Sequence, residues 1–146
     1  FDREFGCSGQ KAGEEVIGCR QHAKLALRAA QEGIAFAFRY GVDIMRESGL
    51  RAGVIRAGHA NLFLSPLFRS TLATLCDANI ELYNTDGALG AARGAALGAG
   101  LYRNRNEAFA SLCRIEEVHP DPAIRQVLEE TYQIWKKELQ LQLENQ

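Results

Sequence analysis

Hydrophobic residues recur over residues 22–48 at the spacing of an α-helix, and they cover most of the surface that such a helix would present. The pattern predicts a long helix that is buried on several sides. Gly49 follows it, at the position where many helices end in a left-handed residue. Gly33 and Gly41 lie inside the segment, and a glycine there costs about 1 kcal/mol relative to alanine. We therefore expect a closely packed neighbour or a bend at these two glycines.

Two shorter runs of apolar residues predict β-strands, and a helix follows the first of them. The first strand covers residues 54–57. A loop then leads to Ser65, which can cap a helix, and to Pro66, which fits the first helical position. That helix is expected over residues 66–77, and the next strand over residues 80–83, where apolar and polar residues alternate. The order strand, helix, strand favours a parallel pair.

The beginning of the chain predicts little regular structure. Residues 1–19 are rich in glycine and predict an irregular lead-in, in which Val16 and Ile17 form one short strand. Three strands make a narrow sheet, so we expect partner strands from elsewhere to complete it. The predicted fold class is α/β, with a small, incomplete sheet and a helix-rich C-terminal half.

Three helices are predicted in the C-terminal half. Residues 88–102 consist mostly of alanine and glycine, with glycines at every fourth position, so these glycines share one face and permit close packing. They are Gly90, Gly94 and Gly98. A short helix is expected around residues 107–113. Asp121 and Pro122 then mark the start of a C-terminal helix within residues 120–146.

Composition narrows the classes of function. The chain has 146 residues, which suits one domain, and a net charge of −1, which gives no electrostatic reason to expect nucleic-acid binding. No apolar run is long enough to cross a membrane, so no membrane partner is expected. The first residues show no signal-peptide pattern and no initiator Met. We therefore expect a cytoplasmic protein, and a chain that is either processed or a piece of a longer one.

The cysteines do not form a metal-binding pattern. They are Cys7, Cys19, Cys76 and Cys113. None belongs to a CxxC motif, and the histidines do not fall at metal-ligand spacing from them. No metal ligand is therefore assigned, and ordinary thiols in a reducing cytoplasm are expected.

The loop after residues 54–57 is the strongest candidate for ligand binding. A strand that runs through glycine into a helix leaves backbone N–H groups free for phosphates or nucleotides, although any tight turn of this kind can use glycine. His59 either contacts a ligand or is a solvated loop residue, and Asn61 either reads a base or ribose or closes an Asx turn. Asp86 either faces a ligand or is a plain turn residue. No nucleophile and base stand out, so no catalytic residue is assigned.

Three segments of the chain, taken together, resemble parts of one known protein family. They are RAAQEGIAFAFRYGVDIMRESGL, VIRAGHANLFLSPLFR and ELYNTDGALGAARGAALGAGLY. In order and spacing they resemble a late helix, the adenosine loop and the terminal small-residue helix of the FGGY-family carbohydrate kinases. The resemblance extends over about residues 16–135, and the xylulokinase subgroup is the most similar.

The resemblance implies an actin-like, ribonuclease-H-like ATPase domain that binds ATP with Mg²⁺. It implies that residues 1–146 are the C-terminal, nucleotide-side domain, without the N-terminal domain that holds the sugar site and the catalytic aspartate. The cofactor-binding residues it implies are Gly58, His59, Ala60, Asn61 and Ser65. The family's loop usually has three glycines, whereas His59 stands in place of one here. Three residues, 62–64, are inserted before Ser65.

The expected function is therefore the nucleotide-binding part of an ATP-dependent carbohydrate kinase that phosphorylates a pentulose, converting D-xylulose to xylulose 5-phosphate. The sugar would bind through the N-terminal domain, so the chain alone is expected to be inactive. Two alternatives stay open: a non-catalytic actin-like nucleotide-binding module, and a helical scaffold whose small-residue face docks another subunit. The oligomeric state also stays open, with a homodimer as one outcome.

Overall fold

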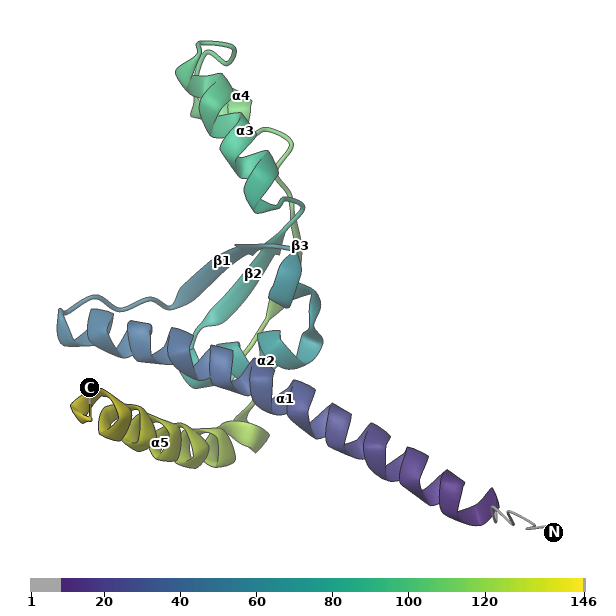
Figure 1. Ribbon diagram of the computed structural model, residues 1–146. Helices are drawn as coiled ribbons and strands as arrows, with labels where there is room; N and C mark the ends of the chain where they lie inside the picture. Colours follow the sequence, from purple (N-terminus) through teal and green to yellow (C-terminus); the bar gives the residue numbers. More distant parts are fainter. Residues whose placement is uncertain (1–8, 146) are drawn as a thin grey trace, which may run out of the picture.

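The computed structural model describes the backbone of residues 9–145 and the side chains of residues 21–145. Helices cover one face of a small sheet, and a helical hairpin projects from one end of that sheet (Figure 1). In chain order the elements are α1 (Gly9–Glu47), β1 (Val54–Gly58), the 3-10 helix η1 (Asn61–Leu64), α2 (Pro66–Cys76), β2 (Asn79–Tyr83), α3 (Gly87–Gly98), α4 (Arg105–Ala108), β3 (Arg114–Val118) and α5 (Pro122–Glu144).

The sheet has the strand order β1-β2-β3. β1 pairs with β2 in parallel, joined by the crossover helix α2, and β3 pairs with β2 in the antiparallel direction. Ile80 and Leu82 of the central strand are both fully buried, and their parallel partners are Ile55 and Ala57. The α/β class and the parallel pair predicted from the sequence are confirmed.

The core lies between the sheet and the helices α1, α2 and α5. Phe68 and Leu72 of α2 are fully buried beneath Ile80 and Leu82. An aromatic cluster joins α1 to α5, with the ring of Phe36 centred 5.9 Å from Tyr132 and 6.0 Å from Trp135. These large side chains bury the most apolar area, so they hold the three helices together.

The other face of the sheet is charged. Glu81 of β2 accepts hydrogen bonds from Arg56 Nε at 2.8 Å, from Tyr83 Oη at 2.9 Å and from Arg114 Nη1 at 3.2 Å. Arg114 also pairs with Glu117 at 2.9 Å. The three strands are therefore tied together on this face by ion pairs, in contrast to the apolar contacts on the face toward the helices.

The α3–α4 hairpin makes few contacts with the core. Arg93 and Ala108 are its buried residues among those that the structure describes. Arg93 donates hydrogen bonds to Thr85 Oγ1 at 3.3 Å and to Ser111 Oγ at 3.0 Å, so one arginine ties the hairpin to the strand ends. Within residues 21–145, no helix is long and apolar enough to span a membrane.

Several sequence predictions are wrong at the level of single elements. Residues 9–19 belong to α1, so Val16 and Ile17 are helical and do not form a strand, while the predicted lead-in over residues 1–8 lies outside the described residues. The third strand is β3, which the sequence did not indicate. The predicted helix at residues 107–113 is the shorter α4, and the chain turns toward β3 after it.

The glycines on the helices also differ from expectation. A side chain built at each of them would meet no other atom within 4 Å, so no described element packs closely there. These are Gly33, Gly41, Gly90, Gly94 and Gly98. Gly49 does have the predicted left-handed conformation, with φ of 84°, and Asp121 caps α5 as predicted by accepting a hydrogen bond from Ala123 N.

Candidate functional site

The candidate site is built around the loop between β1 and α2. The ladder to β2 continues one residue beyond β1, because His59 N donates to Tyr83 O at 2.9 Å. The chain then turns, with a hydrogen bond of 2.8 Å from Ala60 N to Gly58 O. Asn61 has a positive φ of 52°, a conformation that asparagine tolerates better than most residues. The turn therefore directs the chain sharply away from the sheet and into η1.

Gly58 is required at this place by the chain itself. A Cβ atom built on Gly58 would lie 2.4 Å from the carbonyl oxygen of Thr85, closer than real atoms approach. The end of β1 and the turn after β2 can come together only because this residue has no side chain. This explains the glycine without any ligand, so the glycine alone does not identify a nucleotide site.

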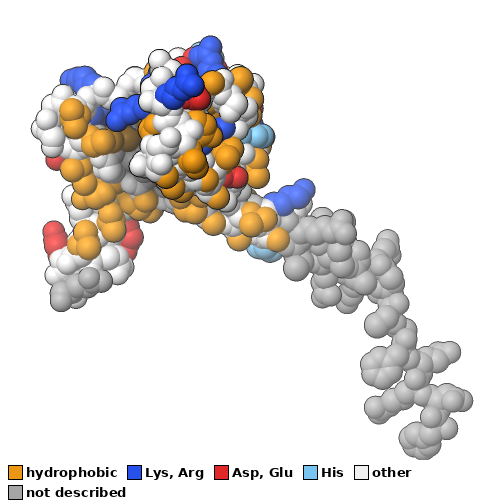
Figure 2. All heavy atoms as spheres, turned by 90° about the horizontal axis from the view of Figure 1, so that it is seen from above, with side chains coloured by type: hydrophobic (Ala, Val, Ile, Leu, Met, Phe, Trp, Pro, Cys, Tyr) orange, Lys and Arg blue, Asp and Glu red, His pale blue; other side chains and the backbone are white. Residues whose placement is uncertain are grey.

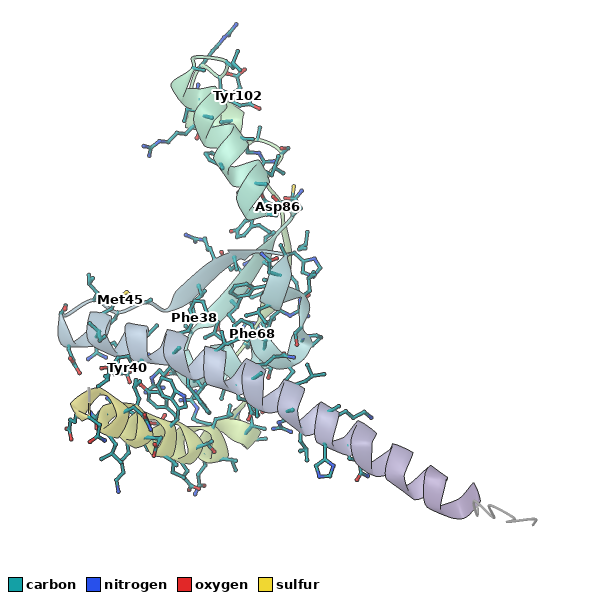
Figure 3. All side chains as sticks on the ribbon, in the orientation of Figure 1. Phe38, Tyr40, Met45, Phe68, Asp86 and Tyr102 are labelled. Atoms are coloured by element: carbon teal, nitrogen blue, oxygen red, sulfur yellow. The ribbon has the colours of Figure 1, made fainter. Side chains whose placement is uncertain are left out.

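Asp86 begins α3 beside this contact, as Figure 3 shows at the base of the projecting hairpin. Its Oδ1 atom accepts a hydrogen bond of 2.7 Å from Leu89 N, so it is the N-cap of the helix. The first turn of α3 therefore faces the β1–α2 loop, and Gly87 leaves its backbone uncovered.

A cavity of about 290 Å³ separates the loop from the start of α3. It brings together three predicted site residues, Gly58, Ala60 and Asn61, with Asp86 and Gly87. Its apolar wall consists of Phe38, Leu62, Phe63 and Phe68. Phe63 and Phe38 both contact Phe68 edge-on, with ring centroids at 5.5 Å and 6.2 Å. We call this space the loop cavity; it combines backbone polar groups with an aromatic wall.

The other two predicted site residues do not line the loop cavity. His59 lines a neighbouring hollow of about 350 Å³ that shares Ala60 and Asp86 with it. Ser65 is the N-cap of α2, accepting from Phe68 N at 3.3 Å, and its hydroxyl donates to Gln31 Oε1 at 2.6 Å. Ser65 therefore links α2 to α1, and its hydroxyl is fully engaged.

The aromatic wall is what sequence reasoning missed. Phe38 is one of the apolar residues that cover most of the surface of the predicted long helix. In the structure it is half exposed and lines the loop cavity. Phe63 belongs to the inserted residues, which had no assigned role. The inserted apolar run Leu62–Leu64 was the available signal, because exposed apolar residues in a loop require a surface to pack against.

Within residues 21–145, no group of three or more His, Cys, Asp and Glu side chains is placed to hold a metal ion. Burial raises the pKa of the Cys76 thiol to about 11, whereas Cys113 is exposed. Cys76 is consequently a core residue and a poor nucleophile at neutral pH.

Comparison with known proteins links the chain to a solved kinase structure. No family model matches the sequence, and no curated protein matches it. Among solved structures, the chain matches the xylulose kinase from Rhodospirillum rubrum with 25% sequence identity and a TM-score of 0.56. The match covers 73% of this chain. This chain resembles a xylulose kinase. The resemblance stated from the sequence is thereby confirmed, and the chain spans 22% of that enzyme's length.

Proposed function

We propose that this chain is the nucleotide-binding, C-terminal domain of an ATP-dependent carbohydrate kinase. The observation that carries the proposal is the structural match to a xylulose kinase over 73% of the chain. The same domain would have the actin-like ATPase fold, completed by strands that this chain does not supply. We place the kinase in the cytoplasm.

The loop cavity is the proposed place for the adenosine. Its volume of about 290 Å³ is near the lower end of the range for ligand sites, about 300 to 1,000 Å³. The aromatic wall offers a surface for a base, and Asn61 carries both a donor and an acceptor that can read a base or ribose. The exposed backbone of Gly87 lies beside the Asp86 cap at the start of α3, where an N–H group can meet an anionic oxygen.

The remaining loop residues receive different roles in this proposal. His59 would contact the nucleotide from the adjoining hollow, which shares Ala60 and Asp86 with the loop cavity. Ser65 would act indirectly, because it fixes the start of α2 and so the far end of the loop. Phe38 and Phe63 are added to the proposed set as the wall on which the base would lie.

The proposed acceptor is a pentulose, with D-xylulose converted to xylulose 5-phosphate. Phosphoryl transfer depends on positioning and on neutralising charge, a task that Mg²⁺ shares with protein groups. The described carboxylates form no cluster suited to Mg²⁺, so no step through the metal is assigned to this chain. The catalytic base and the sugar site would come from the rest of the intact enzyme, and the chain alone would be inactive.

Nucleotide binding and turnover can be tested separately. Titration of the chain with ATP, followed by nuclear magnetic resonance, should shift the amides of Gly58, Ala60 and Asn61. Asn61→Ala should weaken ATP binding about tenfold, because it removes one side chain that hydrogen-bonds to the nucleotide. Asn106→Ala, on the exposed α4, is the matched control and should bind like the unchanged chain.

Turnover requires the intact protein that contains this chain. A coupled assay with ATP and a panel of ketoses should show phosphorylation that depends on both substrates, with D-xylulose preferred. ATP binding without any turnover would favour the non-catalytic nucleotide module. The absence of both ATP binding and turnover would refute the kinase proposal.

A further inference from the structure

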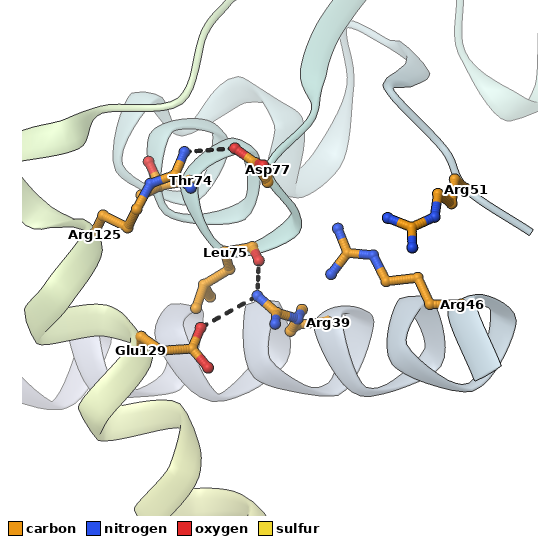
Figure 4. Close-up of a pocket in the computed structure, with 8 residues that line it drawn as sticks. All are labelled: Arg39, Arg46, Arg51, Thr74, Leu75, Asp77, Arg125 and Glu129. Atoms are coloured by element: carbon orange, nitrogen blue, oxygen red, sulfur yellow. Dashed lines mark hydrogen bonds and ion pairs between the residues drawn. The ribbon is translucent and has the colours of Figure 1, made fainter.

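A second cavity lies at the opposite end of the sheet from the β1–α2 loop. It has a volume of about 380 Å³ and is bordered by the end of α1, the segment before β1, the end of α2 and the first turns of α5 (Figure 4). Its lining residues include four arginines, Arg39, Arg46, Arg51 and Arg125, and two carboxylates, Asp77 and Glu129. We call it the arginine cavity.

Two of these arginines are explained by the fold. Arg39 donates to the carbonyl oxygen of Leu75, and Arg46 donates to that of Cys76 at 2.5 Å. Both carbonyls belong to the last turn of α2, where a helix lacks internal donors and carries partial negative charge. Arg39 and Arg46 therefore stabilise the C-terminal end of α2, with Asp43 of α1 placed against both of them.

A third arginine is paired on the surface. Arg125 Nη2 lies 2.5 Å from Asp77 Oδ1, and Asp77 itself ends α2 in the left-handed conformation with φ of 48°. Glu129 lies 3.4 Å from Arg39. Each carboxylate that lines the arginine cavity is thus already paired with an arginine.

Arg51 has no such explanation. Within residues 21–145 its guanidinium has no hydrogen bond or ion pair, although it lines the arginine cavity. Figure 4 shows Arg46 and Arg51 directing their guanidinium groups toward the same part of the cavity, with neither lining carboxylate between them. Four arginines face three carboxylates, counting Asp43, so one positive charge is left without compensation.

We propose that the arginine cavity binds a phosphate-type oxyanion between Arg46 and Arg51. Two guanidinium groups that point into the same space repel each other, and an oxyanion bound there would accept a charge-assisted hydrogen bond from each of them. The planar donor fork of arginine matches the geometry of phosphate oxygens. The ligand is either free phosphate or the phosphate group of a small monoester. This site is separate from the loop cavity and does not depend on the proposed kinase function.

Binding can be measured on the 146-residue chain by calorimetric titration with sodium phosphate against a sodium chloride buffer of equal ionic strength. We expect saturable binding of one phosphate per chain. Arg51→Ala should weaken it at least about tenfold, because it removes a charge-assisted hydrogen bond. Arg103→Ala is the matched control: it removes the same charge from the loop between α3 and α4, far from the cavity, and should leave binding unchanged. Arg51→Lys should restore part of the affinity.

A parallel titration with glycerol 3-phosphate distinguishes the two sources of the anion. Tighter binding than that of inorganic phosphate supports a monoester ligand, and equal or weaker binding supports free phosphate. Any one of three results overturns the proposal. They are phosphate binding that does not saturate, the same phosphate affinity for Arg51→Ala as for the unchanged chain, and equal weakening of phosphate binding by Arg51→Ala and Arg103→Ala. The same phosphate titration can be followed by nuclear magnetic resonance. Amide shifts at Gly58–Asn61 instead of near Arg51 would also overturn the proposal, and they would leave the proposed nucleotide site intact.

Discussion

Asp43 of α1 is partly buried, and it links α1 to α5 through the side chain of Tyr132. Its Oδ1 atom accepts from Arg39 Nε at 2.8 Å, and its Oδ2 atom accepts from Tyr132 Oη at 2.8 Å. The guanidinium of Arg39 also lies over the ring of Tyr132, 5.2 Å from its centre. Partial burial raises the pKa of Asp43, but hydrogen bonds from Arg39 and Tyr132 outweigh it and hold the net pKa below the ordinary value of 3.8.

The first prediction concerns the charge of Asp43. Because its folded-state pKa is lowered, the stabilisation is fully present above pH 3.8 and is lost as the pH falls through the folded-state pKa. Asp43→Asn should lower the free energy of unfolding by roughly 2 kcal/mol near neutral pH, less than for a fully buried pair because solvent reaches the site. Urea unfolding should show this difference unchanged from about pH 7 to about pH 4 and narrowing as the pH falls further. Glu130→Gln, on the exposed side of α5, is the control, and a pH-independent difference would contradict the assignment.

Gly58 gives a second test at the scale of a residue. Gly58→Ala places a methyl group against Thr85 O, so either the end of β1 or the turn before α3 must move. We expect a loss of roughly 1 to 3 kcal/mol, as for other overpacked sites, measured by thermal unfolding. Gly53→Ala is the matched control, because a side chain there meets no atom within 4 Å. Equal stability of the two variants would show that the turn yields without cost.

The elements differ in how clearly the sequence encodes them. α2 is well predicted because Ser65 and Pro66 mark its start and an apolar stripe faces the core. β3 is an edge strand that carries Glu116 and Glu117, and four of its five residues are exposed, so it has no alternating pattern to detect. The pairing of Arg69 with Glu116 at 2.9 Å and the hydrogen bonds to β2 determine it, and these partners lie far away in the sequence. Tertiary contacts therefore override weak local preference here.

The glycines of α3 provide a prediction at the scale of an element. Their shared face suggests close packing, but a side chain at Gly90 or Gly94 would meet no described atom within 4 Å. The double variant Gly90→Ala, Gly94→Ala should therefore raise the helix content and the stability of α3, by up to about 1 kcal/mol for each alanine. Circular dichroism during heating measures both the helix content and the stability. Gly100→Ala should be destabilising, because Gly100 has a φ of 75°. Loss of stability in the double variant would instead mean that another surface packs against these glycines.

At the scale of the whole molecule, large apolar side chains remain uncovered. Hydrophobic side chains occupy much of the face seen in Figure 2. Leu25 and Leu27 of α1 are 64% and 65% exposed, and Leu101 at the end of the hairpin is 75% exposed. The sequence predicted an incomplete sheet and a buried first helix. It could not predict which faces of the helices are buried by contacts within this chain, because those contacts depend on which elements meet across the sheet.

The last prediction follows from the uneven distribution of the core. Ile80 and Leu82 lie at its centre, whereas the α3–α4 hairpin is held at its base by hydrogen bonds of Arg93 and Asn84. Opening the hairpin exposes little apolar area, so it should occur without unfolding the sheet. In native-state hydrogen exchange we expect the amides of β2 and α2 to exchange only by global unfolding, and those of α3 to exchange at least about tenfold faster. Arg93→Ala should accelerate exchange in α3 and leave β2 unchanged. Equal protection of α3 and β2 would show that the hairpin and the core unfold as one cooperative unit.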